Sequence, residues 1–113
     1  PVSEHLQDGI APPQYFMKPN HIRIIEREEF KTMVTDAGLE IESHNLYGFY
    51  WSLWFLMFWG SDKQNFNPPY PEHLDHWTRT WKALLETEGG KEIKRRLDQV
   101  IPKNQSIIAK KPL

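Results

Sequence analysis

The sequence contains no cysteine, which excludes disulfide bonds and thiolate metal sites. A long hydrophobic run is also missing, because the longest, Phe49 to Trp59, spans only 11 residues and includes Ser52. A membrane-spanning helix needs about 20 apolar residues, so this run is expected to form a buried or interfacial helix. No membrane partner is expected. The formal net charge of -1 gives no electrostatic reason to expect a nucleic-acid partner.

Several short motifs that carry chemistry are absent as well. There is no G-x-G pattern, and the only adjacent glycines are Gly89 and Gly90. There is no Ser/His/Asp order, no phosphate-binding loop and no zinc signature, so no metal site is expected. The first residues show no basic segment followed by an apolar stretch, so a signal peptide is not expected. We expect a cytoplasmic location.

Length and composition indicate a small globular chain that is rich in aromatic side chains. With 113 residues the chain is long enough for one domain and too short for two. Hydrophobic residues make up 39% and charged residues 26%, which is typical of soluble globular proteins. Five Trp, six Phe and four Tyr supply burial, although each indole N–H and phenol O–H still needs a hydrogen-bond partner.

Hydrophobic periodicity predicts six elements after a proline-rich, loop-like start at 1–20. Gly38 stands where a left-handed helix cap would lie, and Pro71 is suited to the first turn of a helix. A polar, proline-marked loop is expected at 61–71. The six elements are a helix at 26–37, a strand at 39–47, helices at 49–59, 74–85 and 93–101, and a strand at 105–110.

Two features of this pattern indicate that the chain is not complete by itself. The helix at 49–59 is apolar nearly all round, so it must be surrounded by protein or by a ligand. Two strands alone do not make a stable sheet in water. We therefore expect either missing sequence or an oligomer.

Five short segments stand in an order that a known family also shows. They are Pro1-Val2-Ser3-Glu4, His21-Ile22-Arg23, Glu28-Glu29-Phe30, Ala37-Gly38-Leu39-Glu40-Ile41 and the closing 102–112. On these residues the sequence resembles the C-terminal part of class I S-adenosylmethionine-dependent methyltransferases. In that family a helix leads through a short A-G-F/L-x-V/I junction into the sixth strand, and the seventh strand often ends in A-x-K-P. The resemblance covers roughly 1–48 and 91–113, and the middle of the chain is variable in the family.

The resemblance implies an α/β fold class, the C-terminal part of a Rossmann-like methyltransferase, with 1–113 as a single partial domain. The order would be helix–strand–helices–strand, with Leu39–Tyr47 and Gln105–Lys110 as antiparallel neighbours. The intact enzyme would use S-adenosylmethionine to methylate a small molecule. This chain lacks the glycine-rich turn that holds the cofactor. We therefore expect no cofactor binding and no activity from the chain alone, and a homodimer or another partner at its open strand edge.

Candidate site residues fall in two groups. His21 and Arg23 lie in a loop just before a helix, where they either reach the mouth of an active site or only fix the loop. The aromatic run from Tyr47 to Trp59 either lines an apolar substrate pocket or packs in a core or interface. The pocket candidates in this run are Tyr47, Tyr50, Trp51 and Trp54.

Two further clusters have plainer interpretations. His73 and His76 are three residues apart near a helix start, but no third metal ligand has suitable spacing, so a solvated helix face is favoured. The basic run at 91–96 alternates with acidic residues and is also expected to face solvent. The alternative to a methyltransferase portion is a small α+β binding or dimerisation module whose aromatic helix holds an apolar ligand.

Overall fold

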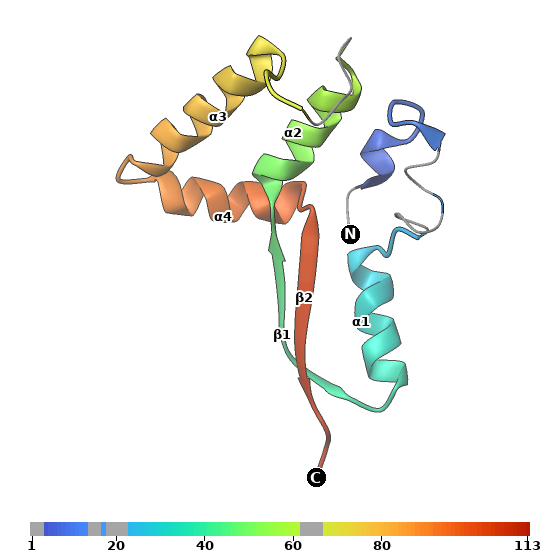
Figure 1. The fold of residues 1–113 in the computed structure, drawn as a ribbon. Coiled ribbons are helices and arrows are strands. Elements are labelled where there is room, and N and C mark those ends of the chain that lie inside the picture. The colour runs from blue at the N-terminus through green and yellow to red at the C-terminus, as the bar shows by residue number, and fades with distance from the viewer. Residues whose placement is uncertain (1–3, 14–16, 18–22, 62–66) are drawn as a thin grey trace.

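The computed structural model describes residues 4–13, 17, 23–61 and 67–113, in which four α-helices and a two-stranded antiparallel sheet form a mixed α/β arrangement (Figure 1). A short 3-10 helix, η1 (Glu4–Gln7), precedes them. In chain order the elements are α1 (Arg27–Asp36), β1 (Glu40–Tyr47), α2 (Phe49–Trp59), α3 (Glu72–Leu85), α4 (Gly90–Val100) and β2 (Asn104–Lys110).

The molecule has a helical end and a sheet end. Helices α2, α3 and α4 gather at one end, and β1 and β2 extend away from them with α1 alongside (Figure 1). The principal extents are 53 × 41 × 19 Å. Because a helix with its side chains is about 10–12 Å across, the smallest extent leaves room for roughly two layers. Much of the sheet end therefore faces solvent.

The turn from α1 into β1 follows the sequence expectation. Gly38 adopts a left-handed conformation with φ +84°, which costs glycine little because it has no Cβ. Its N–H donates to Thr35 O at 2.9 Å, and Ala37 N–H donates to Met33 O at 3.2 Å, so carbonyls of the last helical turn are satisfied. The chain then enters β1 two residues later.

The two strands pair antiparallel, which confirms the expectation that they are neighbours. Glu40 lies opposite Lys110, Tyr47 lies opposite Asn104, and the register shifts between Ile41 and Ser43. The lead-in to α1 is tied to this sheet, because Gln105 Nε2 donates to Ile25 O at 2.8 Å while Gln105 Oε1 lies 2.8 Å from His44 Nε2.

Helix α2 begins at once after the sheet, on a second left-handed glycine. Gly48 has φ +95°, and a Cβ there would lie 3.0 Å from the Cβ of Lys103. Lys103 N–H donates to Tyr47 O at 3.0 Å, so the entry to β2 is held against the end of β1. This close approach of two chain segments needs glycine both for its conformation and for its missing side chain.

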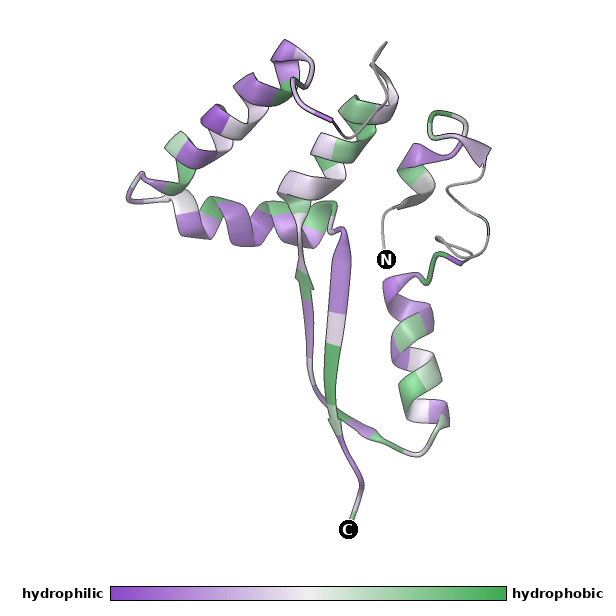
Figure 2. Cartoon of the chain, viewed as in Figure 1, coloured by the Kyte–Doolittle hydropathy of each residue, from purple (hydrophilic) through white to green (hydrophobic). Residues whose placement is uncertain are grey.

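Burial is concentrated in the helical end. The buried hydrophobic cluster comprises Ala11, Trp54, Phe58, Trp59 and Leu74, of which Phe58 is fully buried. Figure 2 shows the contrast between apolar α2 and the more polar α3 and α4 around it. The expected helices at 74–85 and 93–101 are confirmed with earlier starts. Pro71 is the N-cap of α3 and not part of its first turn, which corrects that detail.

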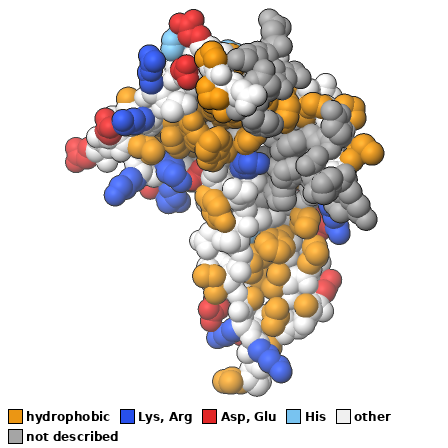
Figure 3. Space-filling model, in the orientation of Figure 1, with side chains coloured by type: hydrophobic (Ala, Val, Ile, Leu, Met, Phe, Trp, Pro, Cys, Tyr) orange, Lys and Arg blue, Asp and Glu red, His pale blue; other side chains and the backbone are white. Residues whose placement is uncertain are grey.

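The sheet end has no buried residue in any of its regular elements. None of the residues of α1 is buried, and the strands β1 and β2 contain only half-buried and exposed positions. Hydrophobic side chains also lie open over this end in Figure 3, and Met33, Leu39 and Ile108 are 37–56% exposed. The α1–β1–β2 unit therefore has apolar surface but no core of its own.

None of the helices in the described segments combines the length and the apolar character needed to cross a membrane.

Candidate functional site

The candidate site lies between α2 and α3, and the position of α2 is set from its first residue. Asp98 on α4 is buried, and its Oδ1 accepts the Phe49 N–H at 2.9 Å. Its other oxygen, Oδ2, accepts from Lys94 Nζ at 2.5 Å. A carboxylate at the start of a helix satisfies an otherwise unpaired N–H and interacts favourably with the helix dipole. Helix α4 thereby anchors the N-terminus of α2.

Aromatic side chains then align α2 with α3. The rings of Tyr50 and Trp77 are stacked, with centroids 5.9 Å apart and an interplanar angle of 13°. The Trp77 indole N–H donates to Tyr50 O at 3.1 Å, and the Phe49 ring contacts both Trp77 and Trp81. One face of α3 is therefore packed against the first turn of α2, and the two helices lie next to each other in Figure 1.

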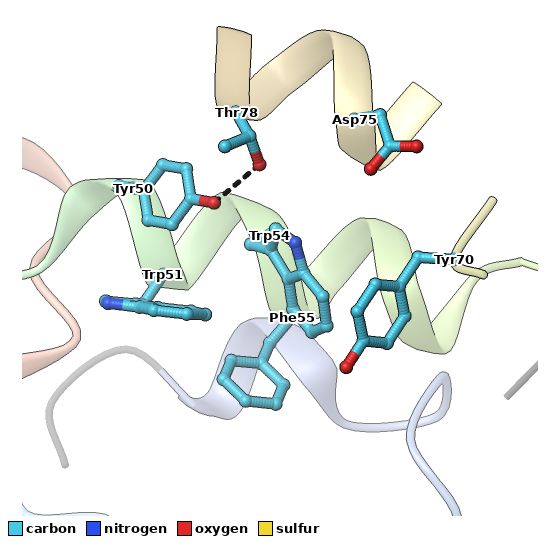
Figure 4. Close-up of a pocket in the computed structure, with 7 residues that line it drawn as sticks. All are labelled: Tyr50, Trp51, Trp54, Phe55, Tyr70, Asp75 and Thr78. Carbon is cyan, nitrogen blue, oxygen red and sulfur yellow. Dashed lines mark hydrogen bonds between the residues drawn. The ribbon is translucent and has the colours of Figure 1, made fainter. Parts of the chain in front are cut away.

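Beyond this contact the structure forms an open pocket of ≈ 460 Å³. That volume is within the range of small-molecule sites, which is about 300–1,000 Å³. Five of its lining side chains are aromatic, and Figure 4 shows them arranged along α2 beneath the start of α3. The lining residues are Tyr50, Trp51, Trp54, Phe55, Tyr70, Asp75 and Thr78.

The pocket explains why α2 has no polar face. The rings of Trp54 and Phe58 are stacked with centroids 5.1 Å apart, and both side chains belong to the core. Trp51, in contrast, is 47% exposed on the side of α2 that lines the pocket. The expectation that protein or a ligand surrounds α2 is thus met only in part by the described residues. The uncovered aromatic surface of α2 is the wall of the cavity.

A chain of hydrogen bonds fixes the direction of the phenol group in the pocket. Thr78 Oγ1 donates its single proton to Leu74 O at 3.0 Å. The 2.7 Å contact between the Tyr50 hydroxyl and Thr78 Oγ1 therefore has Tyr50 as its donor. The Tyr50 oxygen consequently keeps its lone pairs for an acceptor role toward the cavity.

Charge in the described lining is negative. Among the described lining residues only Asp75, in the first turn of α3, is charged, and no described cation forms an ion pair with it. The ammonium of Lys103 lies 5.0 Å from the centroid of the Phe55 ring, which is a cation–π distance. A ring that lines the pocket thus already carries a cation on its surface.

The structure brings three of the six sequence candidates into this pocket, namely Tyr50, Trp51 and Trp54. Tyr47 ends β1 with its side chain exposed and does not line the cavity. Arg23 is exposed and bonds the carboxylate of Glu29, again away from the lining residues. His21 lies outside the described residues.

Four lining residues were not among the candidates. Phe55 belongs to the aromatic run but was not singled out, and Tyr70 lies between two prolines in the loop before α3. Asp75 and Thr78 are three residues apart, so they lie on one face of α3. The spacing predicts that Asp75 and Thr78 share a helix face. It does not indicate that this face borders a pocket, because that depends on the position of α3 beside α2.

The remaining polar clusters are structural in character. His76 Nε2 lies 3.4 Å from Glu72 Oε1, and the described residues contain no group of three side chains able to hold a metal ion. In α4, Glu92 binds both Arg95, at 2.6 and 2.9 Å, and Arg96, at 3.0 Å. The hydrogen bonds from Arg95 and then Arg96 lower the pKa of the Glu92 carboxyl from 4.5 to about 2.

The chain matches no protein-family model, no curated protein and no solved structure. The candidate site therefore has to be interpreted from its own geometry.

Proposed function

We propose that this chain is the C-terminal, substrate-side portion of a class I methyltransferase that uses S-adenosylmethionine to methylate a small molecule. The observation that carries the proposal is the open sheet end. There, α1 leads into β1, β1 pairs antiparallel with β2, and none of these elements has a buried residue. This is the arrangement expected for the last helix and last two strands of a larger Rossmann-like sheet.

The energetics of the sheet support this interpretation. A two-stranded sheet is at best marginally stable in water, and burial of apolar surface is the main favourable term in folding. Here α1 covers one side only in part, and Ile108 on β2 remains 56% exposed. Further strands at the edge and helices on the open face would bury this surface. The α1–β1–β2 unit is thus suited to dock against the rest of a sheet.

The position of the pocket supports the substrate-side assignment. All seven lining residues lie between β1 and β2 in the sequence, on α2, on α3 or in the loop before α3. Helix α2 starts one residue after β1 ends, so the pocket is attached directly to the end of a sheet strand. Ligands of open α/β sheets bind at strand ends, which is where an acceptor would meet a cofactor.

The described residues do not fit the cofactor itself. The turn from β1 to α2 contains the single glycine Gly48, and the N–H of Phe49 is already taken by the carboxylate of Asp98. A helix start occupied in this way offers no free N–H group at its first residue. Cofactor binding is therefore assigned to the rest of the intact enzyme and to none of these residues.

Titration of labelled S-adenosylmethionine tests the proposal. It should be run on the 113-residue chain and on the longest protein that the gene encodes around it. The proposal expects stoichiometric binding to the longer protein and none to the chain alone. Tight binding to the chain alone, or a gene that encodes no glycine-rich strand–turn–helix upstream of Pro1, would overturn it.

A binding module is the second candidate, and one observation favours it. The described residues alone supply an aromatic wall, a hydroxyl and a carboxylate to the pocket. A self-contained module would bind an apolar ligand without S-adenosylmethionine, and Trp51→Ala would abolish that binding. The Tyr47→Ala variant is the control, because Tyr47 is similarly exposed and lies outside the pocket.

We also propose that the isolated chain self-associates through its open strand edge. Unpaired N–H and C=O groups along an edge strand are a template for pairing with another chain. Sedimentation velocity should then show a dimer whose population increases with concentration. Ile108→Lys places a charge on β2 and should shift the chain toward monomer, whereas Val100→Lys, at an exposed position at the end of α4, should not. A monomer at all concentrations would contradict this proposal.

A further inference from the structure

From the lining of the pocket between α2 and α3 we infer that its ligand is a small organic ammonium ion on an apolar or aromatic body. As a substrate class this inference rests on the proposed methyltransferase function, whereas the binding preference itself does not. Three independent features of the lining favour a cation: the aromatic faces, the hydrogen-bonding polarity and the sign of the charge.

The aromatic faces are the first feature. Five of the seven described lining side chains are aromatic, namely Tyr50, Trp51, Trp54, Phe55 and Tyr70. The face of an aromatic ring carries partial negative charge and attracts a cation within about 6 Å of its centroid, which is how aromatic cages recognise ammonium groups. The Lys103 ammonium, 5.0 Å from the Phe55 centroid, shows such an attraction inside this protein.

Hydrogen-bonding polarity is the second feature. Because the Tyr50 hydroxyl donates to Thr78, its oxygen faces the pocket as an acceptor. The Asp75 carboxylate is acceptor-only in its ionised state. Apart from the Tyr50 hydroxyl, whose proton is given to Thr78, the donor that Figure 4 shows turned toward α3 is the indole N–H of Trp54, and it is neutral. Two acceptors of this kind are complementary to the N–H groups of an ammonium ion.

Charge is the third feature. The described lining holds one carboxylate, Asp75, and no lysine or arginine. Asp75 is also free of ion pairs with the described cations, so its charge is available to a ligand. An anionic ligand would meet both a like charge and the negative ring faces. Complementary charge gives specificity to a pocket whose remaining surface is apolar.

Three soluble probes of similar shape separate these possibilities: 2-phenylethylammonium, 2-phenylethanol and phenylacetate. Each is titrated into the 113-residue chain by calorimetry and by tryptophan fluorescence, with affinities in the millimolar range expected of ligands of this size. The inference predicts that the ammonium probe binds roughly tenfold more tightly than the alcohol and that phenylacetate binds most weakly. Equal binding of the three probes, preference for phenylacetate, or no binding of any probe overturns it.

Matched variants locate the preference. Asp75→Asn should weaken ammonium binding by roughly fivefold and leave the alcohol unchanged. Glu72→Gln is the control, because it removes the same charge from the same helical turn but lies outside the pocket. Equal losses in the two variants would mean that only general charge is sensed, and would overturn the assignment. Circular dichroism of both variants verifies that α3 remains folded.

The outcomes separate this inference from the proposed function. Ammonium binding together with a longer protein that ignores S-adenosylmethionine would leave the inference standing and remove the methyltransferase. S-adenosylmethionine binding by the longer protein together with a preference for the neutral alcohol would leave the methyltransferase and remove the ammonium ligand.

Discussion

The buried carboxylate of Asp98 on α4 accepts the N–H of Phe49, the first residue of α2, across 49 positions of sequence. This single contact joins the end of the sheet, the pocket helix and the last helix. Because the N-cap of α2 is Gly48, which has no side chain, the N-terminus of α2 has no capping side chain of its own. Asp98 supplies the cap from another element, and Lys94 balances its charge.

Removal of this carboxylate should be costly. We expect Asp98→Ala to lower the free energy of unfolding by about 1–3 kcal/mol, because it leaves the half-buried N–H of Phe49 without its acceptor and removes the partner of Lys94. Asp98→Asn should cost less, since an amide oxygen still accepts from Phe49. Urea denaturation followed by tryptophan fluorescence measures both. The exposed Asp36→Ala serves as control, with an effect within about 0.5 kcal/mol. An Asp98→Ala variant as stable as the parent would refute this role.

The glycine at the start of α2 makes a second prediction. Gly48→Ala introduces a left-handed alanine at a cost of about 1–2 kcal/mol and brings its Cβ within 3.0 Å of Lys103 Cβ. Gly38→Ala has the same backbone strain but no atom within 4 Å, so it should cost less. Gly89→Ala has neither problem and should stay within about 0.5 kcal/mol. The denaturation midpoint should therefore be lowest for Gly48→Ala, intermediate for Gly38→Ala and highest for Gly89→Ala. Equal midpoints would argue against the close contact.

Core and pocket aromatics should separate stability from binding. Phe58→Ala empties a fully buried position and should cost about 3–5 kcal/mol. Trp51→Ala removes a side chain that is 47% exposed on the cavity wall, so it should cost under about 1 kcal/mol and abolish ligand binding. Denaturation and ligand titration on the same samples test the contrast. Retained ligand binding in Trp51→Ala would count against the pocket.

The free energy of unfolding at acidic pH should depend on the protonation of Glu92. Arg95 and Arg96 lower its folded-state pKa from 4.5 to about 2. A depressed pKa means that its stabilising contribution is present above pH 4.5 and is lost as the pH falls from 4.5 to about 2. Carbon NMR titration should locate the midpoint, and Glu92→Gln should flatten the pH dependence in this window. The exposed Glu88→Gln is the control. A Glu92 midpoint at its ordinary value would contradict the Arg95–Glu92–Arg96 geometry.

Local patterns in the sequence predict the four α-helices and both strands, but not η1, which lies in the segment expected to be loop-like. The alternation at 39–44, the apolar run at 49–59 and the glycine at 38 act over neighbouring residues, and the structure confirms the corresponding strand, helix and left-handed turn. Antiparallel pairing of the two strands was expected from the family resemblance and is confirmed. Helix starts were less accurate, because α3 and α4 begin earlier than their first apolar residues.

The pocket could be predicted only on its α2 side. Tyr50, Trp51 and Trp54 share one continuous segment, so their common environment follows from helical spacing. Asp75 and Thr78 look like ordinary polar residues until α3 packs beside α2 through the Tyr50–Trp77 stack. The Asp98 cap is similarly a tertiary contact, so no local pattern indicates it.

The central claim is that the α1–β1–β2 unit is the last part of a larger sheet, and backbone hydrogen exchange at β2 tests it most directly. Every second amide of β2 points away from β1. In the proposed arrangement β2 lies between β1 and a further strand, which supplies the acceptors for these amides. We predict that these amides exchange rapidly in the monomeric 113-residue chain and are strongly protected in the longest protein that the gene encodes around it. Equally rapid exchange of these amides in both proteins would contradict the claim.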